Sequence, residues 1–418
     1  MKPHRLLILG AAIAAGLTPA TIQAQSPTTS APPVIAATPR LQPPPPTPLT
    51  FDDALLKAAN DLFANSQVPA ADVARAVLAI DPLIDGVTGA QSTATRSMER
   101  RIADLVRNSY PKFEVQPFTT ATISHQPVVL IGTFTAINNA GTAGGPRDAY
   151  RICLALIDIR TRKVVSKGVA RAKPEGIDVT PTAFYADVPV WGRDAATDGY
   201  IKTCQATKLG ETIDKGYADR ILASALITDA IQAYDGRRYS EALSFYEAAQ
   251  RTPGGDQLRT LNGVYLANWK LGRTKQAAEA FGHVVDFGLA NQRLSVRFLF
   301  RPGSTSFLTD RRIAAPYTMW LNQIATRATE NNSCLEIVGH TSATGPEPLN
   351  LRLSALRAEQ MRDQLRSQSP KLDGRLIATG VGSRETLVGT GRDNASDALD
   401  RRVEFKIISD CQPPQTKL

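Results

Sequence analysis

The sequence predicts a multidomain α/β protein. It has an N-terminal α/β domain, a short region of α-hairpins, and a C-terminal α+β domain with helices on one face of a small mixed sheet. Three observations predict this class. The chain has 418 residues, which is too long for one ordinary domain. Strand-like and helix-like periods alternate in 50–215 and again in 294–412. Between these stretches the composition shifts to Ala, Leu, Tyr and Gln with helix-turn-helix spacing.

Residues 1–24 have the features of a secretory signal peptide. A basic start with Lys2 and Arg5 precedes an apolar run from Leu6 to Leu17 that is too short to span a bilayer. We expect cleavage after Ala24, and an uncleaved anchor helix is the alternative. Removal of Lys2 and Arg5 lowers the formal net charge of +9 by two, to +7. Such a charge favours anionic surfaces or simply solubility. We therefore expect an exported chain with no integral membrane span in its mature form.

Residues 25–49 are rich in Pro, Ser, Thr and Ala and carry almost no charge. This composition cannot bury a core, and the run from Pro43 to Pro46 favours extended polyproline II. We predict a disordered linker here, and a short tail at 413–418.

The segment 50–215 is predicted to form an α/β domain. Apolar residues recur at helical period in two stretches, and β-branched or alternating runs indicate four strands. The expected helices are Phe51 to Asn65 and Met98 to Asn108, and the expected strands are Ala76 to Ile80, Val128 to Phe134, Ile152 to Ile159 and Val164 to Ala170. The IGTFTA strand and an L-x-D-x-x-T-x-x-V-V hairpin resemble the periplasmic α/β domains of the LpoB, FlgO and CsgG type, and an unrelated α/β domain is the alternative.

The segment 216–290 repeats small and aromatic residues at a fixed offset. Ala242 and Tyr246 are echoed by Ala277 and Phe281, each 35 residues later. This offset resembles the period of tetratricopeptide (TPR) repeats, in which small residues lie where helices cross. The resemblance implies a groove that binds envelope proteins, and a helical spacer is the alternative.

The segment 294–412 alternates strands and helices once more. Its expected elements are a strand from Ser295 to Phe300, a helix from Arg311 to Ala328, a strand from Cys334 to Val338, a helix from Leu349 to Gln368, and strands from Leu376 to Thr379 and Val403 to Ile408. Helices packed on one face of a small mixed sheet are the economical arrangement for this order.

The most specific motif lies from Leu335 to Ala358 and reads LEIVGHTSATGPEPLNLRLSALRA. An apolar strand meets Gly-His-Thr, and the following helix carries Asn350, Ser354 and Arg357 on one stripe. This motif and the later Asp-Arg-Arg-Val-Glu-Phe segment resemble the peptidoglycan-associating domain of the OmpA/Pal/MotB family. The resemblance covers about the last third of the chain.

The resemblance implies a ligand and the residues that bind it. The ligand would be the diaminopimelate residue of the peptidoglycan stem peptide, with Arg357 on its carboxylate and Arg401 close by. The rim would offer neutral hydrogen bonds from a set of polar side chains: Thr341, Ser342, Thr344 and Asn350.

One position of the motif departs from the family. Ser342 stands where the family has an Asp for the ligand's ammonium group, so the anionic half of the site is missing. A charge-assisted hydrogen bond contributes roughly 1.5 to 3 kcal/mol against about 1 for a neutral one, so this loss weakens binding on the order of tenfold. Arg402 and Glu404, later in the chain, are interpreted as surface charges.

Four cysteines occur in this chain: Cys153, Cys204, Cys334 and Cys411. An even number in an exported chain favours disulfides, and three pairings are possible. We favour Cys153 with Cys204 and Cys334 with Cys411, since each pair then stays within one domain. The wide spacing of the cysteines and the four histidines of the chain do not suggest a zinc site.

The sequence favours a non-enzymatic protein. His340 and Ser342 are two residues apart with no positioned acid, so they do not form a hydrolase triad. The resemblances imply a Gram-negative periplasmic protein that associates with peptidoglycan and the outer membrane and presents its other domains to envelope partners. The alternative is an assembly scaffold whose C-terminal domain has lost wall binding. No cofactor, metal or nucleic-acid partner is expected.

Overall fold

The computed structural model describes residues 47–66, 75–143, 147–301, 303–387, 397, 400–409 and 411. The predicted signal peptide (1–24), residues 25–46 of the predicted linker and the tail (413–418) lie outside these described residues. Leu49, at the end of the predicted linker, is already part of the fold. Its N–H donates to the Arg171 carbonyl at 2.9 Å, and its own carbonyl accepts from the Lys173 N–H at 2.8 Å.

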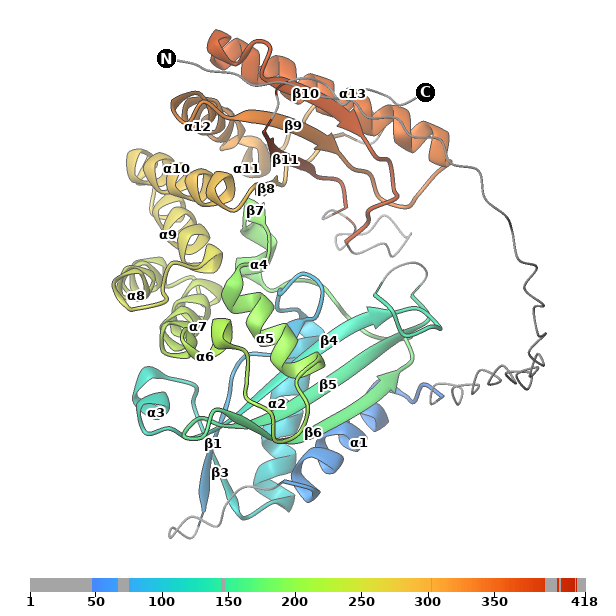
Figure 1. The fold of residues 1–418 in the computed structure, drawn as a ribbon, viewed down its shortest axis with the longest axis vertical. Coiled ribbons are helices and arrows are strands. Elements are labelled where there is room, and N and C mark those ends of the chain that lie inside the picture. The colour runs from blue at the N-terminus through green and yellow to red at the C-terminus, as the bar shows by residue number, and fades with distance from the viewer. Residues whose placement is uncertain are drawn as a thin grey trace, which may run out of the picture. The chain divides into compact units, whose positions relative to one another are not determined.

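The N-terminal sheet has six strands (Figure 1). Its order is β3-β1-β4-β5-β6, and β2 pairs with β4. β1 is parallel to β3 and β4, while β4, β5 and β6 form an antiparallel meander. The bounds are β1 (Ala76–Ile80), β2 (Ile84–Asp85), β3 (Phe113–Gln116), β4 (Val128–Ile137), β5 (Ala149–Asp158) and β6 (Lys163–Ala172).

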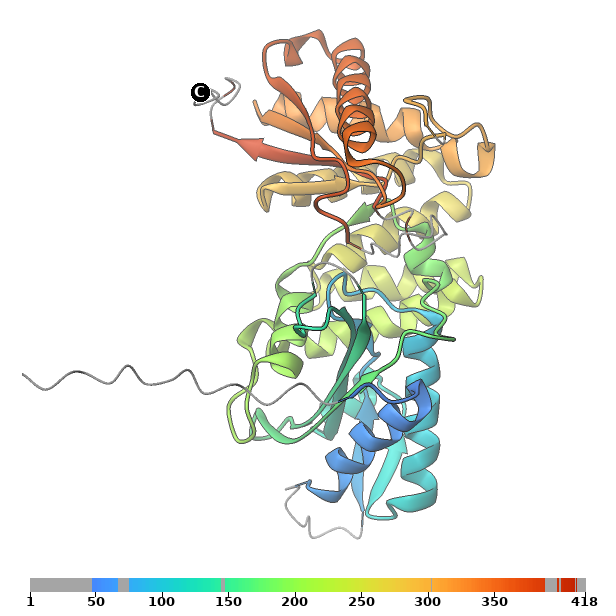
Figure 2. The ribbon, with the colours of Figure 1, turned by 90° about the vertical axis from the view of Figure 1, so that its right-hand side faces the viewer.

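Helices cover both faces of this sheet, and all ten residues of β4 are therefore buried. α1 (Phe51–Ala64) and α2 (Thr93–Ser109) pack on one face, and α5 (Ala195–Gln205) packs on the other (Figure 2). A capping box between Ser92 and Thr95 fixes the start of α2. The shorter helices of this part are α3 (Thr120–Ser124), α4 (Ala183–Asp187) and α6 (Lys215–Ala218).

Two helical hairpins follow in the chain. They comprise α7 (Ile221–Asp235) with α8 (Tyr239–Arg251), and α9 (Leu258–Lys270) with α10 (Thr274–Ala290). Ala242, Tyr246, Ala277 and Phe281, the residues of the 35-residue offset, are all completely buried. The prediction of helix pairs is confirmed, and these residues lie in the core.

The C-terminal sheet has five strands in the order β10-β9-β11-β8-β7. β10 (Leu376–Gly380) is parallel to β9 (Cys334–Gly339), whereas β11 (Val403–Ile408) is antiparallel to β9 and to β8 (Arg293–Val296). The mixed sheet is thus confirmed. Its fifth strand, β7 (Val190–Trp191), comes from a part of the sequence about a hundred residues upstream of β8 and pairs antiparallel with it.

The helices of this part differ from the prediction in one place. The single helix expected from Arg311 to Ala328 is two helices, α11 (Arg311–Ala314) and α12 (Tyr317–Glu330). Pro316 lies between them, because a proline has no N–H to continue a helix. The expected strand from Ser295 to Phe300 also ends early, at Val296. α13 (Glu347–Gln368) packs on β9, β10 and α12, and is followed by the short 3-10 helix η1 (Pro370–Leu372).

One hydrophobic core joins the helical hairpins to the C-terminal sheet. Trp320 of α12 is central to it, with its ring stacked on Phe281 at 5.5 Å between centroids. Its indole N–H donates to the hydroxyl of Tyr265 on α9 at 2.8 Å. No helix among the described residues is long and apolar enough to cross a membrane.

Candidate functional site

The candidate site lies where β9 ends and α13 begins, and two glycines bring these elements together. A Cβ on Gly339 would lie 2.0 Å from the Ser354 carbonyl oxygen, and a Cβ on Gly380 would lie 2.3 Å from the Ala355 nitrogen. Backbone atoms at these distances leave no room for a side chain. Ser354 fixes the contact from the helix, since its hydroxyl accepts a hydrogen bond from the Gly382 N–H at 2.9 Å.

The predicted rim residues meet in the loop between β9 and α13. The Ser342 and Thr344 hydroxyls lie 3.0 Å apart. Asn350 closes the loop, because its side-chain amide donates to the carbonyls of Thr344 and Gly345 at 3.1 and 3.3 Å. Thr341 lies in the same loop and is 3% exposed. The four predicted rim residues are therefore brought together, and the Asn350 amide stabilises the backbone of the loop at Thr344 and Gly345.

Arg357 is buried rather than open to solvent, with 2% of its side chain exposed. Its guanidinium lies over the ring of Phe300, 4.8 Å from the ring centroid. Its Nε donates to the Ser304 carbonyl at 3.2 Å, and Nη2 donates to the Arg301 carbonyl at 3.4 Å. The motif from Leu335 to Ala358 does not predict Phe300 as a partner of Arg357. The stripe of Asn350, Ser354 and Arg357 is confirmed, since all three face inward from α13.

The interpretation of Arg402 and Glu404 as surface charges is wrong. Arg402 is 4% and Glu404 1% exposed, and the Arg402 Nε donates to a Glu404 carboxylate oxygen at 2.8 Å. The second carboxylate oxygen of Glu404 lies 4.0 Å from Nε2 of the buried His340. Glu404 lies on a face of the sheet that upstream residues such as Trp191 cover. A buried ion pair such as that of Arg402 and Glu404 requires this close geometry.

Arg401 lies in the turn that leads into β11. Its side chain is half-buried. Two residues further on, Val403 pairs with Gly339, so Arg401 lies at the same edge of the sheet as the end of β9. The preceding residue, Asp400, is completely buried and accepts a hydrogen bond from the Leu387 N–H at 2.6 Å.

The acidic group nearest in sequence to the rim is Glu347, in the first turn of α13. One of its oxygens accepts from the Ser383 hydroxyl at 2.7 Å, and the other accepts from Nε of Arg384 at 3.1 Å. The hydrogen bond from Ser383 is the main reason that the pKa of Glu347 is lowered. Within the described part of the chain, no group of three or more His, Cys, Asp or Glu side chains could hold a metal ion.

The four cysteines form two neighbouring pairs. Cys334 and Cys411 form a disulfide, so the start of β9 is joined to the residues that follow β11. Cys153 on β5 and Cys204 on α5 are free, buried thiols whose sulfur atoms lie 2.9 Å apart. The structure therefore places the predicted partners next to each other in both cases. A Cys153–Cys204 disulfide stays a prediction.

The chain is similar to several solved structures over its C-terminal part. The peptidoglycan-associated lipoprotein of Burkholderia pseudomallei is 26% identical, over 29% of this chain and 92% of that one, at a TM-score of 0.23. The cell wall anchor of the T6SS from Pseudomonas aeruginosa is 22% identical, over 30% of this chain and 94% of that one, at a TM-score of 0.24. The periplasmic domain of Helicobacter pylori MotB is 16% identical, over 28% of this chain and 76% of that one, also at a TM-score of 0.24.

All three similarities have TM-scores well below 0.5. No protein-family model matches the chain. No curated protein matches it either.

Proposed function

We propose that the chain is a non-enzymatic protein of the cell envelope that associates with peptidoglycan through residues 294–412. The signal-peptide features of residues 1–24 support export to the periplasm. The observation that carries the proposal is the corner itself. Thr341, Ser342 and Thr344 line a loop that Asn350 holds closed, at the end of a strand and beside a helix that carries Arg357.

The ligand that suits this corner is a carboxylate with neighbouring hydrogen-bonding groups, as in the diaminopimelate stem of peptidoglycan. The Arg357 guanidinium is already oriented by Phe300 and by two backbone carbonyls, so little side-chain entropy is lost when it binds an anion. A ligand carboxylate forms a charge-assisted bond with this group, whereas the rim hydroxyls contribute neutral bonds. Arg401 adds a second positive charge at the same edge of the sheet.

The burial of Arg357 also favours a second candidate function. With 2% exposure and carbonyl partners in place, Arg357 stabilises the loop that contains Arg301 and Ser304. A domain in which this is the whole role of the arginine acts as a protein-interaction module of an assembly scaffold. The two functions share the fold and differ in whether the protein sediments with the cell wall.

Sedimentation of the purified protein with isolated sacculi separates the two functions. We expect Arg357→Ala to reduce the bound fraction at least tenfold, and Arg352→Ala to leave it unchanged, because Arg352 is exposed on the same helix. Arg357→Lys retains the charge and should bind to an intermediate extent. Equal sedimentation of wild type and Arg357→Ala, with both proteins folded by circular dichroism, would favour the scaffold.

Presentation of the other parts of the chain to envelope partners is the second half of the proposal. The two hairpins from α7 to α10 share a core with the C-terminal sheet, so they are held firmly next to the proposed wall-binding part. Partner binding can be tested by crosslinking the exported protein in intact cells. Crosslinks confined to the sheet and helices of 294–412 would argue against a role of the hairpins.

A further inference from the structure

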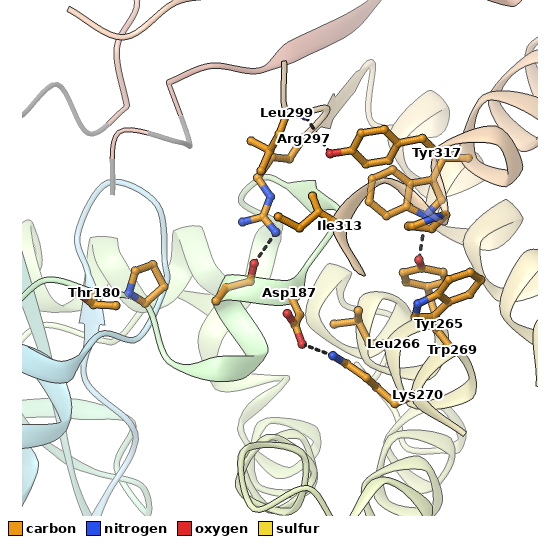
Figure 3. A pocket seen from close by; sticks show the side chains of 14 residues that line it. Thr180, Asp187, Tyr265, Leu266, Trp269, Lys270, Arg297, Leu299, Ile313 and Tyr317 are labelled. Atoms are coloured by element: carbon orange, nitrogen blue, oxygen red, sulfur yellow. Dashed lines mark hydrogen bonds and ion pairs between the residues drawn. The ribbon is translucent and has the colours of Figure 1, made fainter. Parts of the chain in front are cut away.

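A cavity of about 430 Å³ lies between α4, α9 and the start of α12, away from the corner at β9. This volume is within the usual range of small-molecule sites, roughly 300 to 1,000 Å³. Its lining is strongly aromatic, with Tyr265 and Trp269 from α9 and Tyr317 and Trp320 from α12. Figure 3 shows Arg297 across the cavity from Tyr265 and Trp269.

The charge in this cavity is unbalanced. Lys270 and Asp187 neutralise each other, since their charged atoms lie 2.8 Å apart, and the hydroxyl of Tyr234 also donates to Asp187 at 2.7 Å. Arg297 remains. It donates to the Ala186 carbonyl, and no carboxylate of the described residues lies within ion-pair distance of it. The described residues that line the cavity therefore carry a net charge of one positive unit, on the half-buried guanidinium of Arg297.

The hydrogen-bonding groups of the cavity are mainly donors. The hydroxyl of Tyr265 accepts from the Trp320 indole, and the hydroxyl of Tyr317 accepts from the Leu299 N–H at 2.9 Å. Neither phenol hydrogen has an acceptor among the described residues. Burial raises the pKa of both tyrosines, so both hydroxyls remain protonated. Two O–H donors and a guanidinium thus line an aromatic cavity, and Asp187, the carboxylate among its described lining residues, already has partners.

We propose that this cavity binds a small carboxylate with an aromatic or branched apolar body. The carboxylate lies against the Arg297 guanidinium, which forms no ion pair with a carboxylate of the described residues, and the apolar body lies against Trp269 and Leu266. A phosphate or a sugar fits less well, because each brings more acceptors or donors than the aromatic lining can satisfy. Such a carboxylate with an apolar body is either a free acid or the C-terminal residue of a peptide.

Intrinsic fluorescence reports on this cavity directly, since two of the three tryptophans in the chain line it. The probes are 4-phenylbutyrate for a free acid, N-acetylphenylalanine for a peptide end, and N-acetylphenylalaninamide as the uncharged comparator. We expect saturable quenching by at least one acid, with a Kd below about 1 mM, and at least tenfold weaker binding of the amide. The tighter acid identifies the source. Equal binding of acid and amide, or no saturation by either acid up to about 10 mM, overturns the proposal.

Variants test whether Arg297 and Tyr317 contribute to the binding of the acid probes. Arg297→Gln should weaken acid binding at least tenfold and leave the amide unchanged, whereas Arg193→Gln, an exposed arginine paired with Asp198 elsewhere, should change neither. If Arg297→Gln does not fold, Tyr317→Phe removes one O–H donor and should weaken acid binding about fivefold. Unchanged acid affinity in a folded Arg297→Gln or Tyr317→Phe variant contradicts the proposed geometry.

Discussion

Asp81 gives the sharpest prediction about stability. It follows β1, is 3% exposed, and accepts a hydrogen bond from the buried Tyr217 hydroxyl at 2.7 Å. Burial is the main cause that raises the pKa of its carboxyl from 3.8 to about 7, against the opposing hydrogen bond from Tyr217 and the charge of Arg259. Burial also raises the pKa of Glu99 to about 7. Both carboxyls therefore bind a proton more tightly in the folded protein than in the unfolded chain.

The sign of the pH dependence follows from this difference. The folded state binds the proton more tightly than the unfolded state. The contribution of the protonated carboxyl to the free energy of unfolding is therefore complete below about pH 4 and is lost as the pH rises through about 7. For Asp81 alone the loss between about pH 5 and 8 is roughly 3 kcal/mol, since each pKa unit corresponds to about 1.4 kcal/mol. Asp81→Asn removes this loss and retains an acceptor for Tyr217.

Urea unfolding followed by circular dichroism at pH 5 and pH 8, at equal ionic strength, measures how much the free energy of unfolding falls between the two pH values. We expect the free energy of unfolding of the wild type to fall with pH, and that of Asp81→Asn to fall by roughly 3 kcal/mol less. Asp104→Asn, at an exposed carboxyl on α2, is the control and should behave as the wild type. The same pH dependence in Asp81→Asn and wild type would refute the reasoning.

Three further predictions concern the corner and the thiols. Gly339→Ala places a Cβ 2.0 Å from the Ser354 carbonyl oxygen and should destabilise the protein by about 3 kcal/mol or more in urea unfolding; a neutral result would disprove the close approach. Ser342→Asp adds an anion at the rim and should raise the affinity for sacculi on the order of tenfold, and a decrease would exclude a ligand ammonium group at this position. Mild oxidation should link Cys153 to Cys204, whose sulfur atoms lie 2.9 Å apart, and mass spectrometry of a non-reduced digest would contradict this if it found both thiols unmodified.

The sequence predicted best those elements whose period is regular. The sequence predicts the last strand at Val403 to Ile408, and β11 has the same bounds. The helix expected from Leu349 to Gln368 begins only two residues earlier, at Glu347. Short elements were missed, such as β3 (Phe113–Gln116), because four residues carry too little alternation to be distinguished from a loop.

A contact between distant parts of the chain explains the error at Arg402 and Glu404. The alternation of Arg402, Val403, Glu404 and Phe405 indicates a strand with one polar, exposed face. In the structure, however, Glu404 lines a cavity of about 520 Å³ together with Trp191 and other residues of the α/β part. Local periodicity cannot reveal a second covering layer that comes from two hundred residues upstream.

The candidate site was predictable in its residue types but not in their exposure. The motif brought Thr341, Ser342, Thr344 and Asn350 into one loop, as their hydrogen bonds show. The motif gives no sign that Arg357 lies over Phe300. That contact depends on the path of the chain after β8, where the expected strand ends at Val296 and the backbone turns toward α13.

The proposed function depends on the binding of the cell wall by Arg357. Its most direct measurement is the fraction of protein that sediments with purified sacculi, compared between wild type, Arg357→Ala and the exposed control Arg352→Ala at equal protein and salt concentration. Binding of wild type and control, with at least tenfold less binding of Arg357→Ala, is the expected result. Equal sedimentation of a folded Arg357→Ala variant, or no sedimentation of the wild type, would contradict the claim.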